Sequence, residues 1–150
     1  MTQHYVGSKI IEAWPAQKGG VDGYSVKYAD GYISWSPKEV FEAAYIPLGH
    51  IGHLPPHVQR MVGELEQLND KISKLGTFQG TDIYASLSDD ERADLDAQGK
   101  CMVGYWNALL SRVDRARAEY ERPVLTDADA QADLTGGPLP DHSSRHHVDP

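Results

Sequence analysis

The side chains best suited to bind a metal ion form one group in the middle of the chain. Imidazoles are common metal ligands, and three of them lie close together in sequence: His50, His53 and His57. However, Gly52, Pro55 and Pro56 interrupt this segment, so no helix can present the three rings on one face. No cysteine lies nearby, and the nearest acids are Glu42 and Glu64. We therefore expect a proline-rich connector with ordinary histidines, no metal site and no cofactor.

Signatures of catalysis are missing from the sequence. It contains no G-x-S-x-G elbow, no Walker loop and no G-x-G-x-x-G motif. The single cysteine, Cys101, falls in the middle of a predicted helix near its apolar stripe, where we expect a buried and inert thiol. The acids at residues 89–96 are typical of an exposed helix start. We therefore expect that the protein is not an enzyme.

Cationic side chains in the second half of the chain are better candidates for binding. Arg112 lies beside the apolar stripe of its predicted helix, and Tyr105 and Asn107 precede it on the same helix. Such a flank can hold a phosphate with the guanidinium and stack a base on the aromatic ring. The alternative is that these cations only pair with acids one turn away, as Lys74 can with Asp70.

Length, charge and cysteine content restrict the partners. The chain has 150 residues, about one domain's worth, and a net charge of −8. It therefore lacks the basic footprint that a nucleic acid polymer requires. A single cysteine excludes an internal disulfide and fits a reducing cytosol. Because neither a run of about 18 apolar residues nor a basic-then-apolar leader is present, we expect no membrane span and no secretory signal.

A small β unit is predicted at the N-terminus. Tyr5–Trp14 is rich in β-branched and aromatic residues and ends at Pro15, which indicates a first strand. A glycine-rich loop is expected next, and its glycines are Gly19, Gly20 and Gly23. Asp30-Gly31 then predicts a β-hairpin, because both residues tolerate a positive φ.

A two-residue turn at Asp30-Gly31 predicts the register of the two strands around it. Tyr28 is expected opposite Ile33, and Val26 opposite Trp35. This register predicts one buried face, formed by Tyr24, Val26, Tyr28, Ile33 and Trp35. The other face is polar and available to a ligand, and it carries Ser25, Lys27, Tyr32 and Ser34.

A short helix is expected directly after this β-hairpin. Ser36 is predicted as its N-cap, followed by Pro37 at the first helical position and by Glu39 in a capping box. Trp35 and Val40 are spaced to form a hydrophobic staple. The helix is expected to end near residue 45, before the next proline.

Two long helices are predicted between residues 56 and 122. The first has an apolar stripe and is expected to end at Gly76; the stripe is Val58, Met61, Leu65, Leu68, Ile72 and Leu75. The second opens at Ser88 with a capping box, and its stripe is Leu95, Met102, Trp106, Leu109, Val113, Ala116 and Tyr120. A pair of helices buries only one seam, so we expect a further layer, supplied in part by the β unit and mainly by a partner chain.

These elements predict an oligomeric α+β protein with three segments. Residues 1–47 form a β-hairpin module with a small antiparallel sheet and a short helix, and residues 48–122 form a long antiparallel αα-hairpin. Residues 123–150 are acidic and poor in apolar side chains, so we expect a disordered tail that can be deleted without loss of binding.

Two blocks of the sequence resemble known phage proteins. The first runs from His4-Tyr-Val-Gly-Ser-Lys-Ile-Ile-Glu-Ala-Trp-Pro through Gly23-Tyr-Ser-Val-Lys-Tyr to residues 30–45, and it resembles the N-terminal module at the head of proteins similar to Thoeris anti-defence sponges. The second begins at Gly49-His-Ile-Gly-His-Leu-Pro-Pro-His-Val-Gln-Arg and resembles a phage helical-hairpin family. Its layout is similar to the hairpin of Thoeris and anti-CBASS sponges.

The resemblance implies a phage protein that acts in the cytoplasm of the host bacterium. Such sponges bind cyclic oligonucleotides or cyclic ADP-ribose isomers and sequester these immune messengers without cleaving them. They assemble as dimers or higher oligomers, hexamers included, with pockets formed between chains. The alternative function is a non-catalytic structural or protein–protein interaction module assembled through the helical hairpin.

The candidate ligand-binding residues are chosen by chemistry. Arg112 and Arg60 are expected to hold phosphates, Phe78 or Tyr105 to stack the base, and Asn107 to read its edge. The sheet can complete a pocket with Lys27, Tyr32 and Ser34. Each has a structural alternative: Phe78 and Tyr105 can belong to an interface core, and Lys27 can be an ordinary exposed strand residue.

Overall fold

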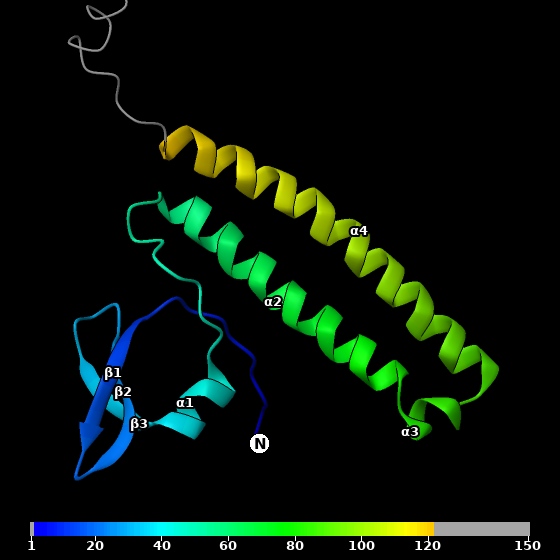
Figure 1. Cartoon of the computed structure of the whole chain (residues 1–150), viewed down its shortest axis with the longest axis horizontal. Coiled ribbons are helices and arrows are strands. Elements are labelled where there is room, and N and C mark those ends of the chain that lie inside the picture. The colour runs from blue at the N-terminus through cyan, green and yellow to red at the C-terminus, as the bar shows by residue number, and fades with distance from the viewer. Residues whose placement is uncertain (1, 122–150) are drawn as a thin grey trace, which may run out of the picture. The chain divides into compact units, whose positions relative to one another are not determined.

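The computed structural model describes residues 2–121, which form a three-stranded antiparallel sheet followed by four helices (Figure 1). The elements are β1 (Glu12–Lys18), β2 (Val21–Lys27), β3 (Ile33–Pro37), α1 (Lys38–Ala44), α2 (Pro56–Gln79), α3 (Asp82–Ala85) and α4 (Asp89–Tyr120). This architecture confirms the predicted fold class, a small sheet with a short helix followed by long helices. The predicted tail, residues 123–150, lies outside the described residues.

The first strand begins later than the sequence predicts. Instead of covering Tyr5–Trp14, β1 runs to Lys18 and contains Pro15, which lies opposite Tyr24 of β2. Proline is tolerated there because β1 is an edge strand, so the missing N–H costs no ladder bond. The turn into β2 is formed by Gly19 and Gly20, whose φ values of 60° and 79° suit a tight hairpin turn.

Gly23 lies within β2 and not in the predicted loop. A Cβ at this position would lie 2.3 Å from the carbonyl oxygen of Ser36 and 2.6 Å from the ring of Trp35. The Trp35 ring therefore lies over the glycine, and its Nε1 donates a hydrogen bond to the carbonyl of Ala16 at 3.1 Å. Gly23, which the sequence predicts in a loop, thus lies in a strand, where its lack of a side chain leaves space for the Trp35 ring.

The register between β2 and β3 differs by one residue from the prediction. Val26 lies opposite Ser34, not Trp35, and Lys27 lies opposite Ile33. The reason is the loop: the Gly31 N–H donates to the Tyr28 carbonyl and the Tyr28 N–H to the Tyr32 carbonyl, both at 2.9 Å, so the loop holds residues 29–31. Gly31 has a φ of 85°, whereas no described non-glycine residue has a positive φ, so a turn with two left-handed residues does not form.

This shift redistributes the predicted faces of the sheet. Residues directly opposite one another share a face, so Ser34 lies with Val26, and Lys27 lies with Ile33 on the opposite side. The predicted polar face is therefore wrong, because Lys27 is separated from Ser34 and Tyr32. Helix α1 packs on the Val26 face, where the ring of Tyr24 stacks on that of Phe41 with centroids 4.3 Å apart.

Helix α1 begins two residues after the predicted N-cap. Ser36 is still part of β3, and Pro37 pairs with Gly23 as the last strand residue. The N-cap is thus Pro37, which offers no side-chain hydrogen bond. Val40 is 60% exposed, so the predicted staple with Trp35 is also wrong.

Helices α2 and α4 lie side by side and antiparallel, and together they form the helical hairpin (Figure 1). The predicted end of the first helix at Gly76 is wrong, since α2 continues to Gln79. The predicted start of the second helix is confirmed: the Glu91 N–H donates to Ser88 Oγ at 3.3 Å, and the Ser88 N–H donates to the Glu91 carboxylate at 3.0 Å. The short helix α3 occupies the connection between them, which the sequence predicts as a loop.

The core of the helical hairpin lies at one end, where α2 begins and α4 finishes. Its buried residues are Ile51, Leu54, Val58, Val62, Leu65, Leu109 and Val113. In residues 69–108, by contrast, no side chain is buried. Leu75 and Met102 of the predicted stripes are only half-buried there, and Cys101 is exposed, contrary to the prediction of a buried thiol. The stripe pattern thus describes a packed core over only half of the hairpin.

Candidate functional site

Two predicted ligand-binding residues lie together near the packed end of the helical hairpin. Tyr105 and Arg112 are two helical turns apart on α4, which places them on the same side of the helix. Tyr105 Oη donates a hydrogen bond to the carboxylate of Glu64 on α2, and Arg112 Nη2 lies 3.8 Å from Met61 Sδ. We call Met61, Glu64, Tyr105 and Arg112 the Tyr105–Arg112 cluster.

The charges of Glu64 and Arg112 have opposite effects on the pKa of Tyr105. The hydrogen bond to Glu64, partial desolvation and the charge of Glu64 raise the pKa of Tyr105 above its ordinary value, while the charge of Arg112 lowers it. The phenol therefore stays neutral at physiological pH and remains a hydrogen-bond donor. Within residues 2–121, no carboxylate forms an ion pair with Arg112, so its guanidinium is available to an anion.

Arg60 belongs to the same end of the helical hairpin, because it precedes Met61 on α2. It is exposed, and no ion pair within the described chain involves it. The cation of Lys74, by contrast, is paired with Asp70 at 2.7 Å, as the i,i+4 alternative predicts. Within residues 2–121, the guanidiniums of Arg60 and Arg112 therefore both lie at this end of the hairpin without a carboxylate partner.

The remaining candidates are not brought to this cluster. Phe78 lies near the C-terminus of α2, about 25 Å along the helix from Met61 at 1.5 Å per residue. Its ring contacts that of Tyr84 edge-on, with ring centroids 5.9 Å apart. Asn107 is exposed and lies two residues from Tyr105, so it projects from a different side of α4. Lys27 does not share a sheet face with Tyr32 and Ser34.

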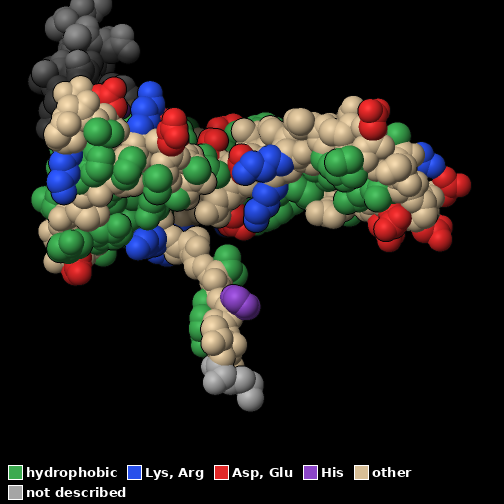
Figure 2. Space-filling model, turned by 90° about the horizontal axis from the view of Figure 1, so that it is seen from below, with side chains coloured by type: hydrophobic (Ala, Val, Ile, Leu, Met, Phe, Trp, Pro, Cys, Tyr) green, Lys and Arg blue, Asp and Glu red, His purple; other side chains and the backbone are tan. Residues whose placement is uncertain are grey.

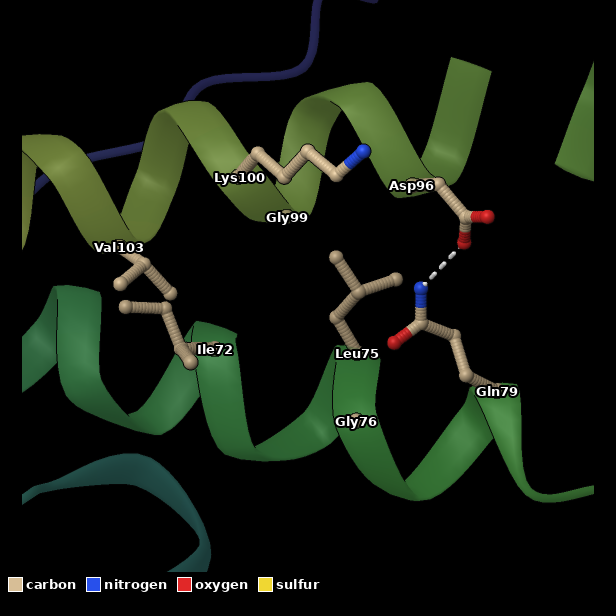
Figure 3. Close-up of a pocket in the computed structure, with 8 residues that line it drawn as sticks. All are labelled: Ile72, Leu75, Gly76, Gln79, Asp96, Gly99, Lys100 and Val103. Atoms are coloured by element: carbon tan, nitrogen blue, oxygen red, sulfur yellow. Dashed lines mark hydrogen bonds between the residues drawn. The ribbon is translucent and has the colours of Figure 1, made fainter. Parts of the chain in front are cut away.

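A second candidate site, which the sequence did not predict, is a groove of about 490 Å³ between α2 and α4. Its lining residues are Ile72, Leu75, Gly76, Gln79, Asp96, Gly99, Lys100 and Val103. Figure 3 shows Ile72 and Val103 facing each other at one end, Leu75 in the middle, and the hydrogen bond from Gln79 to Asp96 at the other end, 2.9 Å long. A sequence signal for it was the pair of helical glycines that line it, Gly76 near the end of α2 and Gly99 in α4.

Other classes of site find little support in the described chain. Within residues 2–121, no group of three or more His, Cys, Asp or Glu side chains is placed to hold a metal ion. No described helix is long and apolar enough to cross a membrane. Figure 2 shows cations interspersed with acids on the visible face, and acids gathered at the end of the hairpin where α4 begins, without a continuous basic band.

A comparison with known families gives a match over the helical hairpin. Residues 55–115 match the family model Sequestin. The Sequestin match covers α2, α3 and most of α4, and with them the Tyr105–Arg112 cluster and the groove. It confirms the predicted likeness to sponge-type anti-defence proteins and supports a sequestering role in general. No curated protein and no solved structure gives a significant match.

Proposed function

We propose that this protein is a phage-encoded, non-enzymatic sponge for a nucleotide-derived immune messenger. The messenger is a cyclic oligonucleotide or a cyclic ADP-ribose isomer, and sequestering it in the host cytoplasm blocks bacterial anti-phage signalling. The Sequestin match over residues 55–115 carries this proposal, because it supports sequestration independently of any single residue.

The Tyr105–Arg112 cluster supplies chemistry suited to such a ligand. The Arg112 guanidinium has no carboxylate partner in the described chain, and it can form paired hydrogen bonds to a phosphate. The Tyr105 ring, 46% exposed on the same side of α4, offers a surface on which a base can stack. A pocket needs only a few such groups, so the net charge of −8 does not oppose the binding of a small anion.

The proposal includes an oligomer, either a dimer or a higher assembly. Support comes from residues 69–108 of the helical hairpin, where no side chain is buried although apolar residues such as Leu75 and Val103 are present. A partner chain can bury these residues and complete a pocket between chains.

A bind-and-release assay tests the function. The purified protein is incubated with cyclic di- and trinucleotides and cyclic ADP-ribose isomers, freed of unbound compound and denatured by heat, and the released species are identified by mass spectrometry. Recovery of an intact messenger supports the sponge and names its ligand. A converted product would show catalysis, and retention of nothing from the panel would contradict the proposal.

One observation favours the alternative, a protein–protein interaction module. On the sheet, Trp14 is 43% exposed, and Val21 and Ile33 are each more than half exposed, so an apolar surface remains uncovered in the described chain. A module of this kind tolerates Arg112→Ala and fails when a core residue such as Leu109 is changed. A sponge requires Arg112 for ligand retention, so Arg112→Ala separates the two functions.

A further inference from the structure

The segment that precedes β1 has the residue types of a strand but no strand partner in the described chain. Residues 2–11 belong to no helix or strand, and Figure 1 draws them as a dark blue coil. We call them the N-terminal arm. Aromatic and β-branched side chains such as Tyr5, Val6 and Ile10 favour strands. Tyr5 is 87% exposed and Val6 is fully exposed, so nothing within residues 2–121 covers either side chain.

The arm contacts its own sheet close to its junction with β1. Lys9 Nζ lies 4.4 Å from the centroid of the Tyr28 ring, in a cation–π contact. The Tyr5 hydroxyl donates a hydrogen bond at 2.8 Å to the side chain of Gln3, which is itself part of the arm. The part of the arm around Tyr5 and Val6 is thus available to another molecule.

The outer edge of β3 has backbone groups to offer such a strand. The Tyr28 N–H donates to the Tyr32 carbonyl at 2.9 Å, so these two residues form a hydrogen-bonded pair. Such pairs alternate along an antiparallel ladder, so the backbone groups of Ser34 face β2. Ile33 and Trp35 therefore direct their N–H and C=O groups away from β2. In the described chain β3 is the last strand of the sheet, so these groups have no strand partner there.

The opposite edge of the sheet is less suited to a further strand. By the same alternation, Ala13, Pro15 and Gln17 of β1 direct their backbone outward. Pro15 lies in the middle of β1 and has no N–H, and a proline at an edge discourages further pairing. The proline of β3, Pro37, is its last residue and leaves the rest of that edge free. An added strand is therefore expected beside β3.

We propose that the N-terminal arm of one copy of this chain adds a strand beside β3 of a second copy, which returns its own arm in the same way. Main-chain hydrogen bonds to Ile33 and Trp35 hold the arm, and Tyr5 and Val6 lose their exposure against the partner's sheet. One chain supplies both the unpaired strand sequence and the unpaired edge in equal numbers, so a reciprocal exchange leaves neither over.

The area available is that of a stable dimer. An aromatic side chain buries about 150–250 Å², so the two Tyr5 side chains contribute about 300–500 Å². This is about a quarter of the roughly 1,200–2,000 Å² that stable interfaces bury. Val6, Ile10 and the two β3 edges supply further area. The contact is separate from the one proposed at residues 69–108, and it does not rest on messenger binding.

A charge placed on the arm tests the exchange. Val6→Asp is expected to raise the dissociation constant between copies at least about tenfold, because a carboxylate disfavours a strand and resists burial. The fold should persist, since the Val6 side chain is fully exposed. Val40→Asp is the matched control, because Val40 is also an exposed valine, on α1, and it should stay within about twofold of wild type. Sedimentation of the full chain over a range of concentrations measures both.

Proline variants test the edge. Ile33→Pro removes an outward N–H from β3 without removing a ladder bond to β2, and it should weaken association at least about tenfold. Ala13→Pro makes the matched change at the outer edge of β1 and should leave association within about twofold of wild type. NMR of the sheet amides checks that both variants keep the ladder.

A cross-link identifies the occupant. The photoreactive residue p-benzoylphenylalanine is placed at Tyr5, isotope-labelled and unlabelled chains are mixed, and the linked peptides are mapped by mass spectrometry. Links between labelled and unlabelled chains that join residue 5 to residues 32–37 are expected. Links within one copy or to another region overturn the proposal. So does a wild-type protein that stays monomeric at every concentration, or a Val6→Asp variant whose mass equals that of wild type throughout.

Discussion

Tyr105 on α4 donates a hydrogen bond to the carboxylate of Glu64 on α2, and this contact links the two helices beside Arg112. It places a negative charge next to the guanidinium that we expect to hold a phosphate. The contact therefore favours the neutral phenol, which remains a hydrogen-bond donor beside Arg112.

Replacing Glu64 by glutamine is expected to lower the pKa of Tyr105 toward about 10. The hydrogen bond to Glu64 is the largest cause that raises this pKa, so its folded value lies above the unfolded one. The stabilisation of the folded protein by this hydrogen bond is present below about pH 10 and is lost as the pH rises through the raised pKa of Tyr105. NMR titration of labelled tyrosine measures the change. Tyr24, whose pKa Glu42 raises, is the internal control, and an unchanged Tyr105 pKa would contradict the contact.

Arg112→Ala should reduce messenger retention by roughly tenfold to a hundredfold, the range for a lost hydrogen bond to a charged group. The fold should persist because Arg112 is exposed. Arg115→Ala is the matched control, since Arg115 is an exposed arginine on α4 whose Nε donates only to the Ser111 carbonyl, at 3.3 Å, within the described chain. Equal retention by the two variants would show that the cation at residue 112 has no special role.

Leu109→Ala should destabilise the protein by about 2–4 kcal/mol, because it opens a cavity in the packed end of the helical hairpin. Leu109 is only 1% exposed, whereas Val103 on the same helix is 44% exposed. Val103→Ala should therefore cost less than about 1 kcal/mol in the monomer. Urea denaturation followed by circular dichroism measures both, and a similar loss in the two variants would contradict the asymmetric core.

The capping box of Ser88 and Glu91 predicts that the stability of the protein depends on pH in the acidic range. Hydrogen bonds from the Ser88 hydroxyl and backbone hold the pKa of Glu91 below 4.5. The stabilisation is present above that value and is lost as the pH falls through the lowered folded pKa. Glu91→Gln should therefore be less stable than wild type at neutral pH, and the two should converge once the pH falls below the lowered pKa of Glu91. Asp94→Asn, which removes the same charge without the cap, should show no such convergence.

Gly23→Ala is expected to disrupt the sheet, because its Cβ would overlap the Trp35 ring and the Ser36 carbonyl. Trp35 must then leave its position, which breaks its hydrogen bond to Ala16. Tryptophan fluorescence and NMR of the sheet amides measure the loss. Gly7→Ala is the control, since a Cβ there meets nothing within 4 Å, and a native spectrum for Gly23→Ala would contradict the packing.

The sequence by itself determined the elements whose signals are local. The capping box of Ser88 and Glu91 satisfies backbone groups within one turn, so its residue types alone predict where α4 begins. The apolar spacing of Val58, Leu65 and Leu68 likewise predicted α2, because a helix places residues three and four apart on one side. The same spacing could not show that Leu75 and Met102 remain half-buried.

Only the tertiary structure decided what depends on neighbours distant in sequence. The strand position of Pro15 depends on β1 being an edge, and the register at Ser34 depends on a loop that closes at Tyr28 and Tyr32. The local backbone preferences for two- and three-residue loops differ little, so the pairing of β2 with β3 and the packing of α1 decide which loop forms. The contact of Tyr105 with Glu64, like the groove, exists because two helices meet, and helix periodicity alone does not specify where they meet.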